Sequence, residues 1–274
     1  HDNNNIGIDA VGFEGTAPQP ALDQARDGYI AGNMIYDISD NANPAYPPND
    51  NSANAIYVDG GSRIVIERNV MHHNNISVEV ASEHRGHTSS YVKVINNLVY
   101  LDTGPGISIG GYSTPCAKCD VASGTCLACA GSPCTVGMPC GCCGSTDHCS
   151  IVNNTLFHND SFQSGSGEVQ VQYFPADGTV SNNIVDNNIL SANSQGVLVS
   201  DQFNNPVAKL DYNLYFAPNG DPNNNSWQWN KVSYDTFSAY QAGSKNDMHS
   251  PFGDPQFLSL TVPNLWGIFN LPGH

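Results

Sequence analysis

The stretch Ile56-Tyr57-Val58-Asp59-Gly60 alternates apolar and polar residues, and the nearby Ile66-Glu67-Arg68-Asn69-Val70-Met71 places Asn between two apolar runs. Strict alternation predicts a β-strand with one buried face. Asn between apolar runs predicts a tight bend that joins two strands. Both phrases recur in the same order along the chain, which indicates an internal structural repeat.

The bend residue of the repeat is Asn. The aligned positions are Asn33, Asn69, Asn97, Asn154, Asn188 and Asn213. Successive positions lie 25 to 36 residues apart, except for the 57 residues between Asn97 and Asn154. That longer interval contains a Cys-rich segment, so we interpret it as one repeat with an insertion. Stacked repeats would align these Asn side chains in a ladder, each bonding the backbone of its turn and its neighbour.

The strand that precedes the bends has two inward columns of apolar residues. The first column is Ile8, Ile56, Val78, Ile107, Val169 and Val197, and the second is Ala10, Val58, Val80, Ile109, Val171 and Val199. Most of these residues are β-branched, as a stacked parallel sheet requires. One repeat cannot bury its own apolar face, so we expect the repeats to stack around a continuous core as a solenoid.

Three of these phrases carry a family resemblance. The phrases Gly7-Ile8-Asp9-Ala10-Val11-Gly12, Ala55-Ile56-Tyr57-Val58-Asp59-Gly60-Gly61 and Val78-Glu79-Val80-Ala81-Ser82-Glu83, with the Asn bends, resemble the pectin-lyase-like right-handed parallel β-helix superfamily over residues 6–216. The resemblance implies an all-β fold, a right-handed parallel β-helix (solenoid) of about six or more coils. It leaves the reaction open, because that superfamily includes polysaccharide lyases, glycoside hydrolases, uronan epimerases, esterases and phage spikes.

The repeat pattern ends near Phe216, so we expect two parts. Residues 1–216 would form the parallel β-helix, with a Cys-rich loop insertion over 113–149, and residues 217–274 an irregular C-terminal capping segment. A short helix is expected over 236–242. The aromatic residues of this segment would cover the open end of the core, as a solenoid edge needs.

Composition excludes some partners. The chain has 9 Lys and Arg against 25 Asp and Glu, for a formal net charge of −16. Such a surface repels nucleic acids and anionic membranes, and it suits neutral glycans, cation-bridged anionic glycans or Ca²⁺. No stretch approaches the ~18 apolar residues of a membrane span. The chain begins at His1 without Met, which indicates a processed or truncated form.

Alternate residues of the first strand point outward and form an acidic face. The candidate catalytic residues on this face are Asp9, Asp59, Glu79 and Glu83. Neighbouring coils place the Cβ atoms of Asp59 and Glu83 ~8 Å apart, and carboxylates at roughly 5 to 10 Å serve glycosidases. Candidate substrate-binding residues share the face or its rim: Glu14, Tyr57, His84, Tyr112, Glu168, Gln170 and Gln172. Clustering would raise the pKa of one acid and so create an acid–base pair.

Three functions compete for this face. Glycoside hydrolysis needs two carboxylates, which are present. A polysaccharide lyase or uronan epimerase needs a cationic base, usually with Ca²⁺; no Lys or Arg lies in the outward columns, although Arg26 and Arg85 are in nearby loops. The third is a glycan-binding or adhesin module without catalysis. Asp9, Asp59 and Glu79 could hold Ca²⁺ through their oxygens. We place hydrolysis first.

All nine cysteines lie between residues 116 and 149. They are Cys116, Cys119, Cys126, Cys129, Cys134, Cys140, Cys142, Cys143 and Cys149. Two Cys-x-x-Cys pairs are a zinc signal, but only six residues separate them, so we favour disulfides, with the pairing open, over zinc. The odd count leaves one thiol over or pairs it outside the chain. Dense cysteines favour an oxidising compartment, and we expect a secreted or periplasmic protein.

Overall fold

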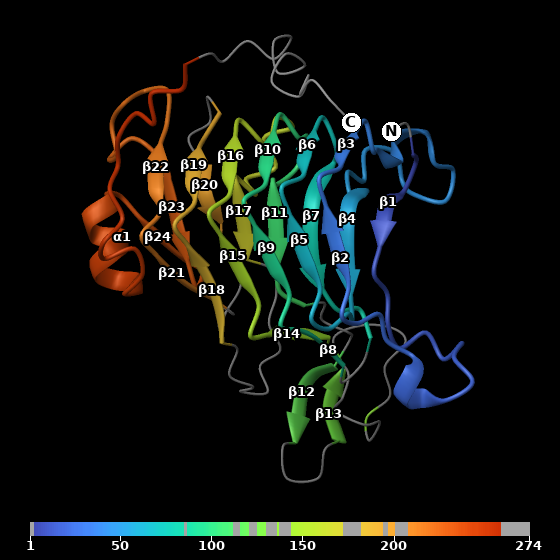
Figure 1. Ribbon diagram of the computed structural model, residues 1–274. Helices are drawn as coiled ribbons and strands as arrows, with labels where there is room; N and C mark the ends of the chain where they lie inside the picture. The colour runs from blue at the N-terminus through green and yellow to red at the C-terminus, as the bar shows by residue number, and fades with distance from the viewer. Residues whose placement is uncertain are drawn as a thin grey trace, which may run out of the picture.

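The fold is all-β and is dominated by parallel sheets. The computed structural model describes residues 3–84, 87–111, 116–120, 125–129, 136, 144–171, 182–193, 197–200 and 208–258. Three large sheets stand side by side, and the chain passes through them in turn (Figure 1). Each strand pairs with the strand that occupies the same place one passage later. This order confirms the internal repeat.

The first sheet has the order β1-β4-β7-β11-β17-β20-β23-β24. Its strands are β1 (Ile6–Asp9), β4 (Asn54–Asp59), β7 (Ile76–Ala81), β11 (Ile107–Ile109), β17 (Val169–Val171), β20 (Val197–Ser200), β23 (Ser226–Trp229) and β24 (Val232–Tyr234). All neighbours are parallel except β23 and β24. The sheet therefore continues beyond residue 216, where the sequence repeat ends.

The second and third sheets have six strands each. The second contains β2 (Tyr29–Ala31), β5 (Val65–Glu67), β9 (Lys93–Ile95), β15 (Ser150–Val152), β18 (Asn183–Asp186) and β21 (Ala208–Asp211). The third contains β3 (Met34–Tyr36), β6 (Val70–His72), β10 (Leu98–Tyr100), β16 (Thr155–Phe157), β19 (Ile189–Ser191) and β22 (Leu214–Phe216). Two small sheets pair β8 (Thr88–Ser90) with β14 (Ser145–Asp147), and β12 (Cys116–Asp120) with β13 (Thr125–Cys129). Two short 3₁₀ helices span Pro20–Leu22 and Asp40–Ala42.

The register of the first sheet confirms the inward columns except in the last repeat. Ile56 pairs with Val78, and Ile107 pairs with Val169. These four side chains are fully buried in one core cluster. Val169 pairs with Val199 and not with the expected Val197. A two-residue shift keeps the same side chains inward because the period of a strand is two, so the sequence pattern cannot reveal it.

The Asn ladder is confirmed at every step. The Asn69 side-chain amide donates to Asn97 Oδ1, and the Asn97 amide donates to Asn154 Oδ1, each at 3.0 Å. The same contact joins the other aligned bends, from Asn33 through to Asn213. The residue before each ladder Asn has a positive φ, for example 52° at Arg68. The bend therefore uses a left-handed conformation, and the Asn that follows satisfies the exposed backbone groups.

A second ladder was not predicted. Asn74, Asp102, Asn159 and Glu168 stack at the turns that lead back to the first sheet. The Asn74 N–H donates to Asp102 Oδ1 at 2.9 Å, and the Asp102 N–H donates to Asn159 Oδ1 at 3.0 Å. Glu168 accepts both the N–H and the side-chain amide of Asn159, at 2.9 and 2.6 Å. Because Glu168 is completely buried, its prediction as a substrate-binding rim residue is wrong.

The C-terminal end of the stack is covered by helix α1 (Phe237–Ser244), close to the expected 236–242. Thr236 caps the helix by accepting the Ala239 N–H at 3.1 Å. The Trp227 ring stacks on Phe237 and Tyr240, and Trp227 is 1% exposed. These aromatic rings close this end of the core.

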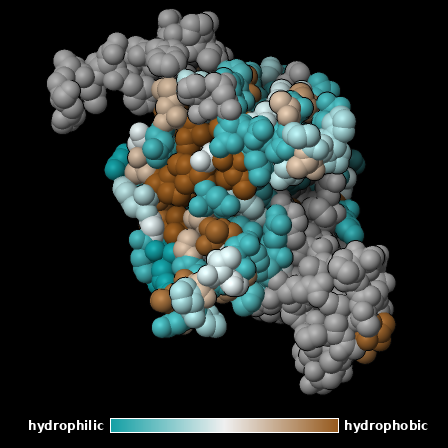
Figure 2. All heavy atoms as spheres, turned by 90° about the vertical axis from the view of Figure 1, so that its right-hand side faces the viewer, coloured by the Kyte–Doolittle hydropathy of each residue, from teal (hydrophilic) through white to brown (hydrophobic). Residues whose placement is uncertain are grey.

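The opposite end is more open. Ile8 and Ile30 pack against the core but are only partly buried. Apolar side chains gather on the end of the molecule that carries β1 to β3 (Figure 2). No helix in the described part of the chain has both the length and the apolar character needed to cross a bilayer.

Cys149 corrects one expectation about the cysteines. It is a free thiol, 2% exposed, within the core cluster. Its Sγ lies 3.6 Å from the Ser89 carbonyl oxygen, and burial raises the pKa of the thiol to about 12. Its inclusion among the disulfide cysteines is therefore wrong, because its position one residue before β15 makes it a core residue. The other cysteine side chains lie outside the described residues.

Candidate functional site

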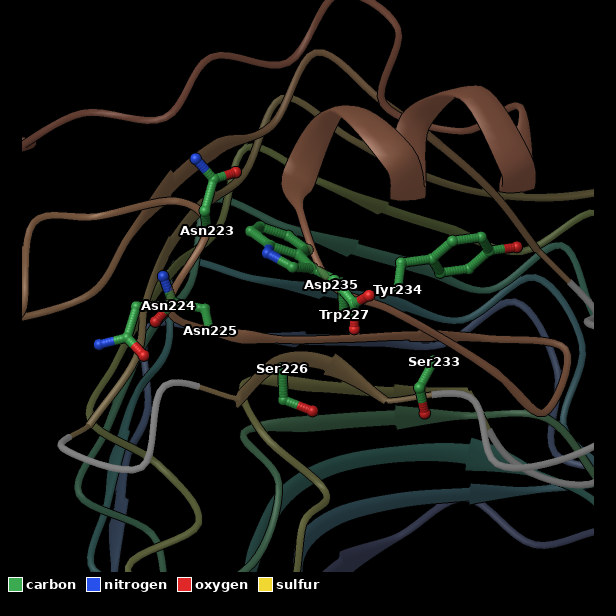
Figure 3. Close-up of a pocket in the computed structure, with 8 residues that line it drawn as sticks. All are labelled: Asn223, Asn224, Asn225, Ser226, Trp227, Ser233, Tyr234 and Asp235. Carbon is green, nitrogen blue, oxygen red and sulfur yellow. The ribbon is translucent and has the colours of Figure 1, made fainter.

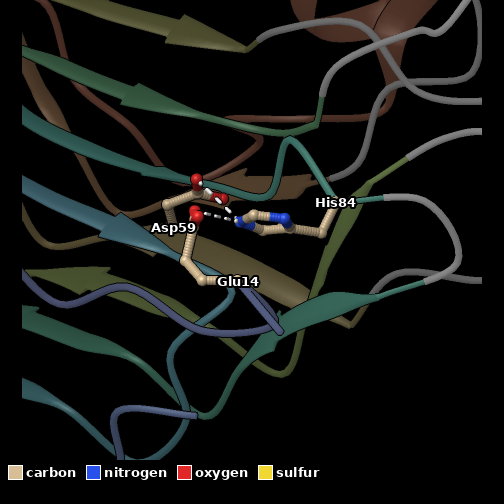
Figure 4. A group of neighbouring side chains, drawn as sticks. All are labelled: Glu14, Asp59 and His84. Carbon is tan, nitrogen blue, oxygen red and sulfur yellow. Dashed lines mark ion pairs between the residues drawn. The ribbon is translucent and has the colours of Figure 1, made fainter. Parts of the chain in front are cut away.

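The acidic residues gather at the carboxyl ends of β1, β4 and β7. Asp9 is the last residue of β1, and Asp59 is the last residue of β4. Glu83 and His84 follow the end of β7 at Ala81, and Glu14 lies in the segment after β1. The three strands are parallel neighbours, so their ends meet at one edge of the first sheet. This edge brings together side chains that are far apart in the sequence (Figure 4).

Asp59 organises the chain beyond β7. The Glu83 N–H donates to Asp59 Oδ1 at 2.8 Å, and His84 Nε2 lies 3.1 Å from Asp59 Oδ2. The Tyr57 hydroxyl donates to Glu83 Oε1 at 3.2 Å. Asp59 and Tyr57 share a strand, so β4 fixes both the backbone and the side chain of Glu83.

The segment after β1 forms a second wall of the site. Phe13 has a φ of 64°, and its ring stacks on His87 at a centroid distance of 3.8 Å. A Cβ atom at Gly60 would lie 2.8 Å from the Phe13 ring, and Gly60 itself has a φ of 78°. Glycine at this position therefore allows the wall to approach β4. The Gly12 N–H donates to the Asp59 carbonyl oxygen at 2.8 Å.

The surroundings raise the pKa of Asp9, Asp59 and Glu83. Burial, reinforced by the charges of Asp59, Glu14 and Glu83, raises the pKa of Asp9 to about 6. Burial also raises the pKa of Asp59, although the Glu83 N–H and His84 oppose it. Burial and the Asp59 charge raise the pKa of Glu83, and the Tyr57 hydroxyl opposes them. Asp9 therefore keeps its proton at mildly acidic pH, while hydrogen bonds to Asp59 and Glu83 partly offset the rise in their pKa.

The predicted site residues differ in their exposure to solvent. Asp9, Glu14 and Glu83 present surface to solvent, although neighbouring groups partly desolvate the carboxyl groups of Asp9 and Glu83. Asp59 is 6% exposed. Glu79 is 1% exposed, so it cannot contact a polymer, and its prediction as a catalytic residue is corrected for that reason. Its place in the outward column is confirmed by its pairing with Tyr57, but this part of the sheet face is covered.

The remaining predicted substrate-binding residues lie partly within and partly outside the described residues. Gln170 is half-buried in β17, where the Ser108 hydroxyl lies 3.5 Å from its side-chain oxygen. Tyr112 and Gln172 lie outside the described residues, as does Arg85. Sequence reasoning missed Phe13 and His87 as parts of the wall. Phe13 follows Asp9 by four residues, so strand alternation already predicted that its side chain points outward.

The structure brings together three potential metal ligands that differ from the expected set. Glu14, Asp59 and His84 each bring one ligand atom within 4.8 Å of the others. Asp59 is common to this group and to the predicted set of Asp9, Asp59 and Glu79. Glu79 is buried on the strand, and Asp9 is not part of the group.

A second concave feature lies at the other end of the first sheet. A cavity of about 470 Å³ is bordered by β23 and β24. Asparagine and serine side chains surround it together with Tyr234 and Asp235 (Figure 3). Trp227 donates its indole N–H to the Pro222 carbonyl oxygen at 2.8 Å, which fixes the ring in the cavity wall.

A comparison with known proteins finds a relative in Bacillus subtilis. The chain is 33% identical over 257 residues to a protein of Bacillus subtilis (strain 168), named "Uncharacterized protein YwoF". The alignment covers 93% of this chain and 47% of the relative, so the chain spans about half the length of the protein that it matches. No family model matches the chain. No solved structure matches it either.

Proposed function

We propose that the chain is a carbohydrate-active enzyme that hydrolyses a glycosidic bond at the edge formed by β1, β4 and β7. The observation that carries the proposal is the convergence of Asp9, Asp59 and Glu83 at this edge. Asp9 and Asp59 end neighbouring parallel strands, and the register pairs Asp9 with Tyr57. The Cβ atoms of Asp9 and Asp59 are therefore ~8 Å apart, and Glu83 joins this group through the contact of its N–H with Asp59. Glycosidases use two carboxyl groups from such a group to act on one glycosidic bond.

Asp9 is the proposed general acid. Its pKa of about 6 leaves it protonated at mildly acidic pH, so it can protonate the leaving oxygen. Glu83 is the proposed base or nucleophile, because it is exposed and its side chain accepts the Tyr57 hydroxyl. A carboxyl group that is protonated and a second one that is ionised can divide these roles. Asp59 is a positioning residue that holds the Glu83 backbone.

We also infer that the three sheets are the faces of a right-handed parallel β-helix. The chain passes through them in turn, and crossovers between parallel strands are right-handed in about 98% of cases. Such a fold offers a long face for a polymer. Five strand steps separate β4 from β23, which places the Asn- and Ser-lined cavity roughly 24 Å from the acids. Its amide and aromatic groups suit uncharged sugar units.

The chemistry of the surroundings favours hydrolysis over β-elimination. His84 lowers the pKa of Asp9, Asp59 and Glu83, and no Lys or Arg of the described residues is among the largest influences on these three acids. The Arg26 side chain donates to the Ala21 carbonyl oxygen. A net charge of −16 suits a neutral or cation-bridged glycan, and the cysteine content suits secretion or the periplasm.

The test is incubation with a panel of polysaccharides, followed by mass analysis of the products. Hydrolysis adds one water to each cleaved bond, whereas elimination leaves an unsaturated sugar that is lighter by one water. We expect saturated products. Unsaturated products would indicate a lyase and contradict hydrolysis. Binding of a glycan without any product would indicate a non-catalytic binding module.

A further inference from the structure

His84 faces two carboxylates with the same ring atom. Its Nε2 lies 3.1 Å from Asp59 Oδ2 and 3.5 Å from Glu14 Oε1. The three residues come from three separate segments: the end of β4, the segment after β1 and the segment after β7. All three side chains point toward one another (Figure 4). The convergence therefore depends on the tertiary fold.

The contacts of His84 Nε2 differ from those of an ordinary ion pair. This atom is buried and lies 3.1 Å from Asp59 Oδ2, but it has no well-aligned hydrogen bond there. Elsewhere in the chain, His249 Nδ1 is hydrogen-bonded to Asp211 at 2.7 Å, and His148 Nδ1 to Asp147 at 2.8 Å. In the tautomer that carries its proton on Nδ1, His84 Nε2 offers a lone pair to a ligand that is shared with the two carboxylate oxygens. Burying such a polar atom is unfavourable unless something binds it.

We propose that Glu14, Asp59 and His84 bind a divalent cation of the first transition row, such as Mn²⁺ or Zn²⁺. Metal–ligand bonds of about 2.0–2.2 Å place adjacent ligand atoms roughly 3.0–3.4 Å apart, close to the two distances from His84. An imidazole ligand favours these metals over Ca²⁺, which prefers six to eight oxygens. The cation differs from the Ca²⁺ expected at Asp9, Asp59 and Glu79.

Neighbouring groups orient the three proposed ligands for a cation. The Glu83 N–H donates to Asp59 Oδ1 at 2.8 Å, which leaves Oδ2 directed at His84. Outer contacts of this kind orient metal ligands and maintain affinity. The Glu14 side chain is 49% exposed, so a cation would have an open side toward solvent. Three protein ligands with an open position are typical of a metal that also binds a water or a substrate oxygen.

The test is titration of the metal-stripped full-length chain with Mn²⁺, with free Mn²⁺ measured by electron paramagnetic resonance. Mn²⁺ is the probe because the cysteine thiolates of the insertion would bind Zn²⁺, whereas carboxylate and imidazole ligands accept Mn²⁺. We expect one bound Mn²⁺ per chain. His84→Gln and Glu14→Gln should each weaken binding at least tenfold. The control His249→Gln removes the imidazole of an exposed ion pair that has a single carboxylate, and it should bind Mn²⁺ like the unmodified chain.

The outcomes are distinct. Absence of stoichiometric binding, or unchanged binding in both His84→Gln and Glu14→Gln, overturns the proposal. Glu14→Gln alters an exposed side chain, so it remains informative if His84→Gln fails to fold. The inference concerns the same site as the proposed function, but its readout is independent of cleavage. Mn²⁺ binding without glycan cleavage would contradict only the proposed hydrolase activity. Glycan cleavage without Mn²⁺ binding would contradict only the proposed cation site.

Discussion

Tyr57 and Glu83 are joined by a hydrogen bond, in which the phenol hydroxyl donates to Glu83 Oε1 at 3.2 Å. The bond lowers the pKa of Glu83, against burial and the Asp59 charge, which raise it. Tyr57→Phe should therefore raise the pKa of Glu83. Because Glu83 must be ionised to act as a base, the acidic limb of the pH profile of kcat/KM should move to higher pH. Tyr91→Phe, at an exposed tyrosine, is the control. Equal pH profiles in the two variants would show that Tyr57 does not control the pKa of Glu83.

Asp9 sets the basic limb of the same profile. A general acid must be protonated, so activity should fall as the pH rises through about 6, the pKa of Asp9. After burial, the Asp59 charge is the largest influence that raises this pKa. Asp59→Asn should therefore move the basic limb to lower pH, measured in EDTA so that no cation alters the charge. A basic limb that stays in place would show that Asp9 is not the titrating acid.

Asp102 makes stability depend on pH. Burial raises its pKa from 3.8 to about 8, so the folded chain keeps a proton that the unfolded chain loses. Its stabilising contribution is complete below pH 3.8 and is lost as the pH rises to about 8. Asp102→Asn should thus stabilise the fold by ~1–3 kcal/mol at pH 8 and by much less at pH 4.

Asparagine fits the geometry of position 102. The neighbouring ladder residues Asn74 and Asn159 donate their amides to the carbonyl oxygens of Ile35 and Val99. Asp102 Oδ2 has no partner and occupies the corresponding place. Urea unfolding at both pH values measures the difference between the two chains. A destabilised Asp102→Asn at pH 8 would contradict the assignment of a protonated Asp102.

The Asn ladder should make unequal contributions along its length. Asn97 is 2% exposed and bonds to Asn69 and Asn154. Asn97→Ala removes these bonds and leaves the Asn69 N–H unsatisfied, so it should cost about 2–4 kcal/mol. Asn33 is half-buried at the first bend, and Asn33→Ala should cost about 1 kcal/mol. Equal free energies of unfolding for the two variants would mean that the ladder is not a continuous element.

The fold was largely predictable because two independent periodicities agree. Alternation in the strands fixed which side chains face inward, and the Asn bends fixed where the chain turns. The pairing of Val169 with Val199 could not be predicted, because a shift of two residues leaves the alternation of inward and outward side chains unchanged. The second ladder was not predicted from the sequence because its members differ in residue type. Asp102 and Glu168 occupy places that Asn occupies in neighbouring repeats.

The site was predictable only in its position. The outward columns identified Asp9, Asp59 and Glu83 from strand alternation. They could not show that Glu79 is covered, because burial on the outer face of a sheet depends on segments that cross it. The approach of Glu14 and Phe13 to His84 and His87 depends on the path of the segment after β1. That path depends on positive φ angles at Phe13 and Gly60, which the alternation of apolar and polar residues does not reveal.

The most direct test of the account is the rate of reducing-end release from the preferred polysaccharide at pH 5, compared among the unmodified chain, Asp9→Asn, Glu83→Gln and Asp27→Asn. Asp27 is an exposed acid paired with Arg63, and its variant serves as the control. We predict that Asp9→Asn and Glu83→Gln each lose about 10²–10⁴-fold in kcat, while Asp27→Asn retains the full rate. Full activity in both Asp9→Asn and Glu83→Gln would contradict the account.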